Sequence, residues 1–263
     1  MAGVKLSRQA NSTVRNGGAV FIGRVVPSWA SAILLLMKTI VITGGSDGLG
    51  RALAEAIASD TKVVILGRDE QKLREVAERS GCDWRQCDVT DAEAVDRVIN
   101  QIALDYGTVD VLVNNAGIFH EGELADASYD DIYKVINVNT TGALYCAKAV
   151  LQHMRARKSG LIINVISQGG LNTRPKRAVY TASKWALTGM TKALQQELGE
   201  YNIRVTGFYP GVMQTEFLKK AGIDEMGASI TLDDAVKAMR YIIDCSDDIL
   251  IPEFGVKNVQ RLI

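Results

Sequence analysis

Seven short apolar runs alternate with amphipathic stretches from residue 38 to the end of this 263-residue chain. Most of the runs are apolar at consecutive positions, which is typical of strands covered on both faces. Alternating strands and helices predict an α/β fold, a doubly wound parallel β-sheet of about seven strands with helices on both faces. We predict the strands at residues 39–43, 62–67, 83–89, 109–115, 160–167, 203–210 and 249–254.

Polar residues mark where several of the helices between these strands begin. Residues 90–93, 128–131 and 231–234 each have the spacing of a capping box, in which a Ser or Thr side chain caps a helix and an acidic residue follows three positions later. No repeat, low-complexity linker or Pro/Gly-rich joint divides the chain after residue 36. We therefore expect one domain over residues 37–263.

The first 36 residues differ from the rest, because they contain four basic residues and no acidic residue. This composition is typical of an organelle-targeting presequence. The alternatives are an arm that packs on the surface, or a chain whose working start is Met37. We favour Met37, because a domain that begins with a strand needs nothing before Lys38.

Overall composition argues against several classes of partner. Thirty basic and thirty acidic residues cancel, whereas a nucleic-acid-binding protein favours a basic surplus. The apolar run at residues 33–36 is too short to span a bilayer. Four scattered cysteines suit neither a disulfide scaffold nor a metal site, so we expect a cytoplasmic protein with reduced thiols and no metal.

The turn after the first strand carries three spaced glycines, Gly44, Gly48 and Gly50. Residues 44–48 read G-G-S-D-G, which fits the nucleophile elbow of hydrolases with Ser46 on a sharp turn. The same turn also suits a dinucleotide pyrophosphate. Glycines let backbone N–H groups approach the phosphates, and the helix that follows points its positive end at them.

The hydrolase alternative requires partners that the chain does not supply. An elbow serine needs an acidic residue and then a histidine downstream. The two histidines are His120, which nothing in the sequence orients, and His153, which falls in a basic helical stretch. We therefore interpret Ser46 as part of a phosphate cradle.

Further short motifs follow the glycine turn in a fixed order. Together they resemble the short-chain dehydrogenase/reductase superfamily in its compact single-domain form, over about residues 38–263. The resemblance implies a Rossmann-like fold and an NAD(P)-dependent oxidoreductase. The motifs are T-G-x-x-x-G-x-G at residues 43–50, N-N-A-G at 114–117, Ser167, Y-x-x-x-K at Tyr180 and Lys184, and Pro210-Gly211 followed by Thr215.

Tyr180 and Lys184 lie one helical turn apart, so their side chains share a face. A nearby ammonium lowers the pKa of a tyrosine, which suits the pair to passing a proton to or from a substrate oxygen. The resemblance assigns Tyr180 as general acid or base, and Ser167 as the donor to the substrate oxygen. It assigns Asn139 to positioning a water beside the lysine, with Asn137 as the alternative match.

The resemblance also implies a set of cofactor contacts. The second strand ends Leu66-Gly67-Arg68, where Gly67 replaces the acidic residue that would hold the ribose of NAD and Arg68 suits the 2′-phosphate of NADP. Asp47 argues for NAD, because an inward carboxylate would repel that phosphate. We favour NADP. The expected contacts are Gly44, Ser46, Asp47, Gly48, Leu49, Gly50, Arg68, Asp88, Val89, Asn115, Ala116, Gly117, Tyr180, Lys184, Pro210, Gly211 and Thr215.

The expected function is NADP(H)-dependent interconversion of a small-molecule carbonyl and a secondary alcohol. Alternatives are a non-catalytic dinucleotide-binding sensor or scaffold, and an NAD-preferring alcohol dehydrogenase. The short segment at residues 216–230 predicts a small lid, and helical stretches at 143–160 and 181–201 predict a homodimer or homotetramer interface. The basic residues of 174–177 either meet an acidic substrate or form a solvated turn. Expected pocket walls are Phe119, Gln168, Tyr209 and Met213.

Overall fold

The computed structural model describes residues 37–213, 215 and 227–261. Our expectations for residues 1–36, and for most of the 216–230 segment, lie outside the described residues. The strands are β1 (Thr39–Thr43), β2 (Lys62–Gly67), β3 (Asp83–Gln86), β4 (Val111–Asn114), β5 (Gly160–Val165), β6 (Ile203–Pro210) and β7 (Glu253–Val256). The α-helices are α2 (Gly48–Ile57), α3 (Glu70–Ser80), α4 (Ala92–Tyr106), α5 (Tyr129–Ile136), α6 (Gly142–Arg157), α7 (Ala178–Leu198) and α9 (Leu232–Asp244).

Short helical turns join some of these elements. A π-helix, η1 (Asn137–Thr141), separates α5 from α6. The 3₁₀ turns are η2 (Gln168–Gly170), η3 (Gly199–Tyr201) and η4 (Val259–Arg261). Within the described ranges, no helix is both long enough and apolar enough to cross a membrane.

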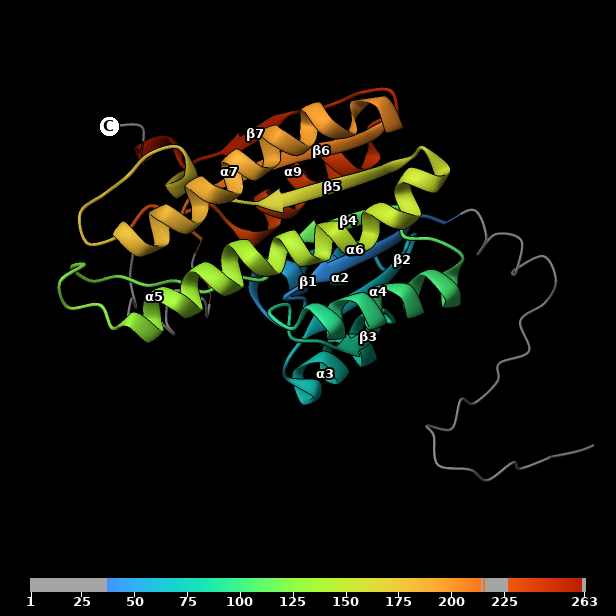
Figure 1. The fold of residues 1–263 in the computed structure, drawn as a ribbon, viewed down its shortest axis with the longest axis horizontal. Coiled ribbons are helices and arrows are strands. Elements are labelled where there is room, and N and C mark those ends of the chain that lie inside the picture. Colours follow the sequence, from blue (N-terminus) through green and yellow to red (C-terminus); the bar gives the residue numbers. More distant parts are fainter. Residues whose placement is uncertain (1–36, 214, 216–226, 262–263) are drawn as a thin grey trace, which may run out of the picture.

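One parallel sheet organises the molecule, with strand order β3-β2-β1-β4-β5-β6-β7. Helices α4, α6 and α7 cover one face, while α2, α3 and α9 cover the other (Figure 1). Ile40 and Ile42 of β1 point into one core and Val41 points into the other. The predicted doubly wound sheet with both faces buried is therefore confirmed.

Some predicted element boundaries are wrong, and the last strand shows why. It begins at Glu253 rather than at residue 249, because Pro252 has no N–H to donate and the ladder with β6 starts at Glu253. Strands β3, β4 and β5 are also shorter than predicted. The helix caps at Ser128 and Thr231 are confirmed.

The predicted cap at Thr90 is wrong, because Asp91 caps α4 instead. Asp91 accepts a hydrogen bond from the N–H of Ala94 at 3.0 Å. The hydroxyl of Thr90 donates to Asp88 at 2.8 Å, so the threonine belongs to the preceding turn.

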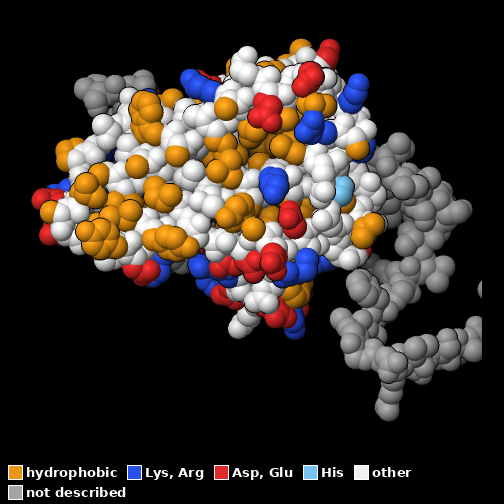
Figure 2. All heavy atoms as spheres, in the orientation of Figure 1, with side chains coloured by type: hydrophobic (Ala, Val, Ile, Leu, Met, Phe, Trp, Pro, Cys, Tyr) orange, Lys and Arg blue, Asp and Glu red, His pale blue; other side chains and the backbone are white. Residues whose placement is uncertain are grey.

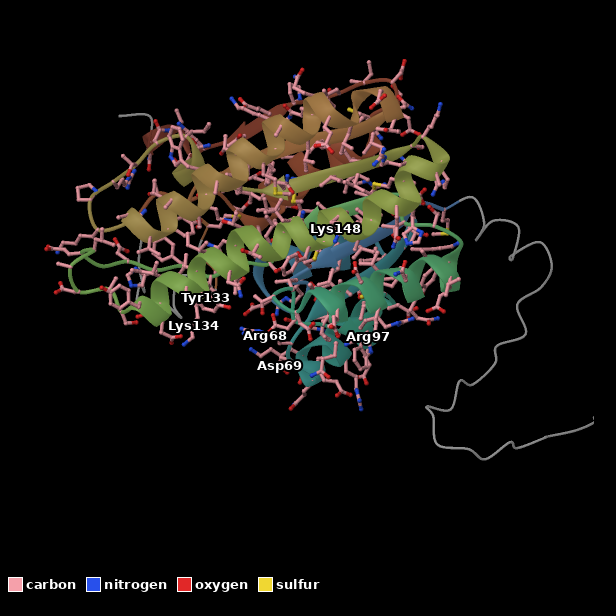
Figure 3. The ribbon with its side chains drawn as sticks, viewed as in Figure 1. Arg68, Asp69, Arg97, Tyr133, Lys134 and Lys148 are labelled. Atoms are coloured by element: carbon pink, nitrogen blue, oxygen red, sulfur yellow. The ribbon has the colours of Figure 1, made fainter. Side chains whose placement is uncertain are left out.

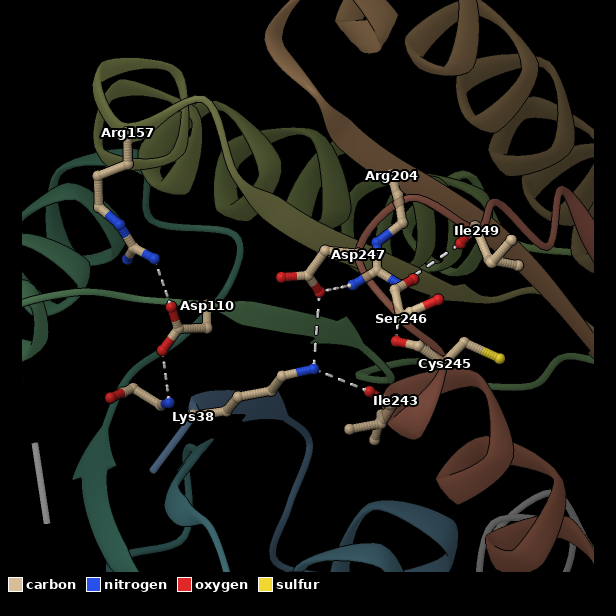
Figure 4. A network of polar contacts seen from close by, with 10 residues as sticks. Lys38, Asp110, Arg157, Arg204, Ile243, Cys245, Ser246, Asp247 and Ile249 are labelled. Atoms are coloured by element: carbon tan, nitrogen blue, oxygen red, sulfur yellow. Dashed lines mark hydrogen bonds and ion pairs between the residues drawn. The ribbon is translucent and has the colours of Figure 1, made fainter. Parts of the chain in front are cut away.

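Charged side chains join several elements near the amino ends of the strands (Figure 4). Lys38 lies 3.7 Å from Asp247, which pairs with the buried Arg204 at 2.7 Å. Asp110 accepts from the first backbone N–H of β1 at 2.8 Å and pairs with Arg157 at 2.6 Å. These contacts tie β1, β6 and the end of α6 together at the edge of the sheet opposite the cavity described below.

Strand order reverses between β1 and β4, which are neighbours in the sheet although β2 and β3 separate them in the sequence. In open parallel sheets, ligands bind outside the carboxyl ends of the strands at such a switch point. We therefore expect a ligand-binding site to be formed by the residues that follow β1, β4, β5 and β6.

Candidate active site

A cavity of about 730 Å³ lies at the carboxyl ends of the strands. Its volume is within the range of about 300–1,000 Å³ typical of small-molecule sites. All of the predicted catalytic and cofactor-binding residues line it except Gly50 and Asn139. The topology thus brings together predicted residues that are up to about 170 positions apart, from Gly44 to Thr215. Within the part of the chain that the structure describes, no group of three His, Cys, Asp or Glu side chains could hold a metal ion.

The glycines of the turn after β1 are needed because the backbone packs closely there. Gly44 has a φ of +64°, and a Cβ on it would lie 2.9 Å from the Cα of Ala116. A Cβ on Gly50 would lie 2.4 Å from Nδ2 of Asn115 and 2.6 Å from the carbonyl oxygen of Gly44. Gly50 therefore supports the turn from behind, which explains why it does not line the cavity.

Asn115 and Thr43 fix this turn against the end of β4. The Asn115 amide donates to the carbonyl oxygens of Thr43 at 2.9 Å and Gly44 at 3.1 Å. The Thr43 hydroxyl accepts from the N–H groups of Asn115 and Ala116, both at 3.0 Å. Thr43 belongs to the glycine motif but was given no role from the sequence, and its position at the end of a buried strand was the available signal.

Asp47 caps the helix that faces the cavity. Its carboxylate accepts from the N–H of Gly48 at 2.8 Å, at the amino end of α2. The carboxylate is thus engaged with the positive end of the helix, a favourable position for an acidic side chain.

The second strand ends at the other side of the turn. A Cβ on Gly67 would lie 3.3 Å from both Oγ of Ser46 and Cδ2 of Leu73, so a larger residue fits there only with some adjustment. Arg68 also lines the cavity and projects from the turn between β2 and α3 (Figure 3). Beyond it, Asp88 and Val89 line the same end of the cavity.

Asn139 lies in the π-helix η1 and is almost fully buried. Its Oδ1 accepts from the N–H of Ile118 at 2.8 Å, while its Nδ2 donates to the carbonyl of Ile118 at 2.9 Å and to Ser183 at 3.0 Å. It therefore holds the loop after β4 against α7 and does not itself line the cavity. Asn137, the alternative match, donates to the hydroxyl of Tyr133 at an exposed position.

Ser167 and Tyr180 meet inside the cavity. Ser167 has a φ of 128°, a strained conformation for a non-glycine residue, and its hydroxyl accepts from the N–H of Gly169 at 3.1 Å. Tyr180 is buried, and its ring meets Phe119 edge-on with centroids 4.6 Å apart. Burial raises the pKa of Tyr180 to about 12, against the lowering effects of its hydrogen bond with Ser167 and of the charge on Arg177.

Lys184 faces the ring of Tyr180 and also binds the end of β5. Its ammonium lies 5.8 Å from the centroid of the Tyr180 ring and donates to the carbonyl of Val165 at 3.0 Å. Burial lowers the pKa of Lys184 to about 8. Ser167 and Arg177 lower the pKa of Tyr180 against the larger effect of burial.

The walls beside Tyr180 partly match the prediction. Phe119, Gln168 and Met213 line the cavity, as expected. Tyr209 does not, because its ring is buried in the core below β6 and its hydroxyl lies 3.3 Å from Glu253. The alternation of side chains along a strand turns it away from the cavity.

Two lining residues, Lys257 and Asn258, follow β7 and were missed. The sequence offered no signal for them, because the last strand was predicted to end before it does. Other lining residues that were not predicted, among them Cys87, Ile118, Val138 and Asn172, belong to segments that were already expected at the site.

Known proteins share this arrangement. A family model described as short chain dehydrogenase matches residues 38–226. An uncharacterized oxidoreductase from Staphylococcus saprophyticus is 34% identical over 232 residues, covering 84% of this chain and 97% of that protein. A trans-4-hydroxycyclohexanecarboxylate dehydrogenase from Sinomonas cyclohexanicum is 36% identical over 190 residues, covering 68% and 73%. The structure of an alcohol dehydrogenase from Thermococcus sibiricus, complexed with 5-hydroxy-NADP, matches with a TM-score of 0.77 and 26% identity, covering 85% and 97%.

Proposed function

The chain belongs to the short-chain dehydrogenase family of oxidoreductases, and we propose that it interconverts a carbonyl compound and a secondary alcohol with NADP(H). The observation that supports this most is that Ser167, Tyr180 and Lys184 line the same cavity as the glycine turn. A dinucleotide-binding sensor or scaffold would not need this set of proton-handling side chains. An alcohol dehydrogenase and a hydroxy-acid dehydrogenase among the similar proteins agree with chemistry at a CH–OH group.

The residues present fit a dinucleotide. A Cβ on Gly48 would meet no atom nearer than Cβ of Thr215 at 3.9 Å, so this glycine leaves room in the cavity, and the amino end of α2 faces the cavity to receive phosphate charge. Asp88 and Val89 would flank the adenine, while Pro210, Gly211 and Thr215 would shape the nicotinamide pocket. When bound, the nicotinamide supplies or accepts the hydride.

The side chains around the substrate oxygen would then handle the proton. With a pKa of about 12, Tyr180 carries its proton at neutral pH and can donate it to a carbonyl oxygen as that carbon is reduced. Ser167 would donate a second hydrogen bond to the same oxygen, so the charge that develops there meets a preorganised donor. Lys184 would hold the nicotinamide ribose.

NADP is proposed over NAD because Arg68 lines the cavity where the second strand ends. The Thermococcus sibiricus neighbour, complexed with 5-hydroxy-NADP, supports the same choice. NAD would instead call for an acidic residue near Gly67, and that position is crowded by Ser46 and Leu73.

Replacing Arg68 by Asp is expected to shift the ratio of kcat/KM for NADPH over NADH by about 10- to 100-fold toward NADH, because hydrogen bonds to charged groups contribute roughly 1.5–3 kcal/mol. Steady-state kinetics with both cofactors measures it. The matched control is Arg97→Asp, on the exposed face of α4 (Figure 3), which should leave the ratio unchanged. An unaltered ratio in Arg68→Asp would show that Arg68 does not bind the 2′-phosphate of NADP.

The proposed reaction is tested by following NADPH oxidation against a panel of ketones, aldehydes, keto acids, ketoacyl thioesters, sugars and steroids. We expect turnover of at least one carbonyl class, with the alcohol as product by mass spectrometry. NADPH binding without turnover of any carbonyl, and without oxidation of the matching alcohols by NADP⁺, would favour the sensor or scaffold.

We also propose that the protein is a cytoplasmic homodimer or homotetramer that associates through α6 and α7. Hydrophobic side chains are spread over the face formed by these helices and α5 (Figure 2). Leu144 and Trp185 are 45% and 51% exposed. A monomer in sedimentation experiments at micromolar concentration would contradict the assembly.

A further inference from the structure

Charge is unevenly distributed around the cavity. Its lining carboxylates, Asp47 and Asp88, lie on the segments after β1 and β3, at the end assigned above to the dinucleotide. The segments beside Ser167 and Tyr180 contribute Arg174, Arg177 and Lys257 to the lining, and no described lining residue there is acidic. The end that would receive the substrate is therefore cationic.

Two of the three cations before α7 already have partners. Arg177 pairs with Glu121 at 3.2 Å and lies 5.2 Å from the centroid of the Phe119 ring, so it is fixed in the wall. Lys176 pairs with Glu123 at 3.5 Å and does not line the cavity. Both acids lie on the loop after β4, and each is paired with a cation of the segment before α7.

Arg174 has no such partner. It lines the cavity, and it makes no hydrogen bond or ion pair with any residue of the described ranges. Lys257, in the segment after β7, also lines the cavity, and its side chain makes no hydrogen bond or ion pair with any described residue. An uncompensated cation at the wall of a concave site attracts anions, and a guanidinium can bind a carboxylate or a phosphate through two parallel hydrogen bonds.

The segment that carries Arg174 is anchored on both sides. The N–H of Asn172 donates to the carbonyl of Gln168 at 2.9 Å. On the other side, Lys176 accepts from the N–H of Gly122 at 2.8 Å through its carbonyl, in addition to the ion pairs just described. Arg174 therefore extends from a short span between two fixed points, which lowers the entropic cost of using it for binding.

We propose that Arg174, assisted by Lys257, forms a subsite for an anionic group of the substrate, remote from the carbonyl that faces Ser167 and Tyr180. The preferred substrates are then keto acids or ketone phosphates, and their reduced hydroxy counterparts. This inference rests on the proposed oxidoreductase function. It specifies that the substrate carries a negative charge, whereas the proposed function specifies only a carbonyl compound or an alcohol.

The test compares matched substrates that differ in one anionic group. Keto acids with different spacers (4-oxopentanoate, 5-oxohexanoate and 4-oxocyclohexanecarboxylate) are each measured against their methyl esters, and dihydroxyacetone phosphate against dihydroxyacetone, all with NADPH. We expect at least one anionic member to exceed its neutral partner about 10-fold in kcat/KM. Whether a carboxylate or a phosphate gives the larger ratio identifies the anion.

Variants then locate the effect. Arg174→Gln should reduce the anionic-to-neutral ratio about 10-fold, Arg174→Lys should restore part of it, and Lys257→Gln should reduce it less. Arg97→Gln, an exposed arginine on α4, is the matched control and should leave the ratio at the wild-type value.

Four outcomes would overturn the subsite. Neutral partners could be turned over as well as, or better than, every anion, in which case the oxidoreductase function stands and the subsite fails. Arg174→Gln could change the ratio no more than Arg97→Gln does, which would make Arg174 a solvated surface residue. If NADPH binds and neither a member of these pairs nor any carbonyl of the panel is turned over, the proposed reaction and the subsite fail together. If other carbonyls of the panel are turned over but no anionic member of these pairs is, the reaction stands and the subsite fails.

Discussion

Replacing Tyr180 by Phe is expected to lower kcat by about 10³-fold while NADPH binding is retained, because the phenol is the proposed proton donor and general acid–base catalysis contributes roughly 10²–10⁴-fold. The change leaves the ring in place, so its edge-on contact with Phe119 at 4.6 Å persists. It removes the hydroxyl that bonds Ser167, which costs about 1 kcal/mol of stability. Steady-state kinetics on a substrate found in the panel, together with a fluorescence titration of NADPH, separates these effects.

Tyr209 provides a control of the same residue type. It is as buried as Tyr180, lies on the adjacent strand β6 and does not line the cavity. Tyr209→Phe removes a hydroxyl that lies 3.3 Å from Glu253, so it should retain full turnover with a small loss of stability. More than a tenth of wild-type kcat in Tyr180→Phe, or equal losses in the two variants, would rule out Tyr180 as the proton donor.

Strands could be predicted where a buried run is bounded by clear turn residues. The predicted boundaries of β1, β2 and β6 agree with the structure at both ends, since each is an apolar run followed by glycine or proline or by a turn. The last strand was misplaced because Ile249 and Leu250 are apolar yet exposed, at 49% and 45%. Apolar composition alone does not distinguish a strand from an exposed loop. Pro252 was the better signal, because it has no N–H to donate and the ladder with β6 begins only after it.

The candidate site could be predicted where short motifs specify it. Tyr180, Ser167 and the glycine turn line one cavity because the parallel topology brings strand ends to one edge. Lys257 could not be found, because its position depends on the placement of β7. The raised pKa of Tyr180 was also missed, since residue spacing tells which side chains share a helix face but not how deeply they are buried.

Replacing Asn139 by Ala is expected to lower both stability and activity, although Asn139 does not line the cavity. Its amide satisfies the N–H and the carbonyl of Ile118 and the hydroxyl of Ser183. Leaving such buried groups without partners costs roughly 1–3 kcal/mol each, so we expect a loss of about 3 kcal/mol in the free energy of unfolding. The adjacent Gly117 lines the cavity, and its loop would lose the clamp, which should lower kcat by about 10²-fold.

Asn137→Ala is the matched control, because Asn137 lies in the same π-helix but its side chain bonds only the exposed hydroxyl of Tyr133, at 3.3 Å, among the described residues. It should change the free energy of unfolding by less than about 0.5 kcal/mol. Urea denaturation measures stability, while kcat and the Kd for NADPH are measured at a temperature where both variants are folded. A positioning role requires that folded Asn139→Ala bind NADPH and still turn over slowly. Wild-type kcat in that folded variant would show that Asn139 has a purely structural role. Equal losses of stability in both variants would show that the hydrogen bonds of Asn139 to Ile118 and Ser183 do not stabilise the loop.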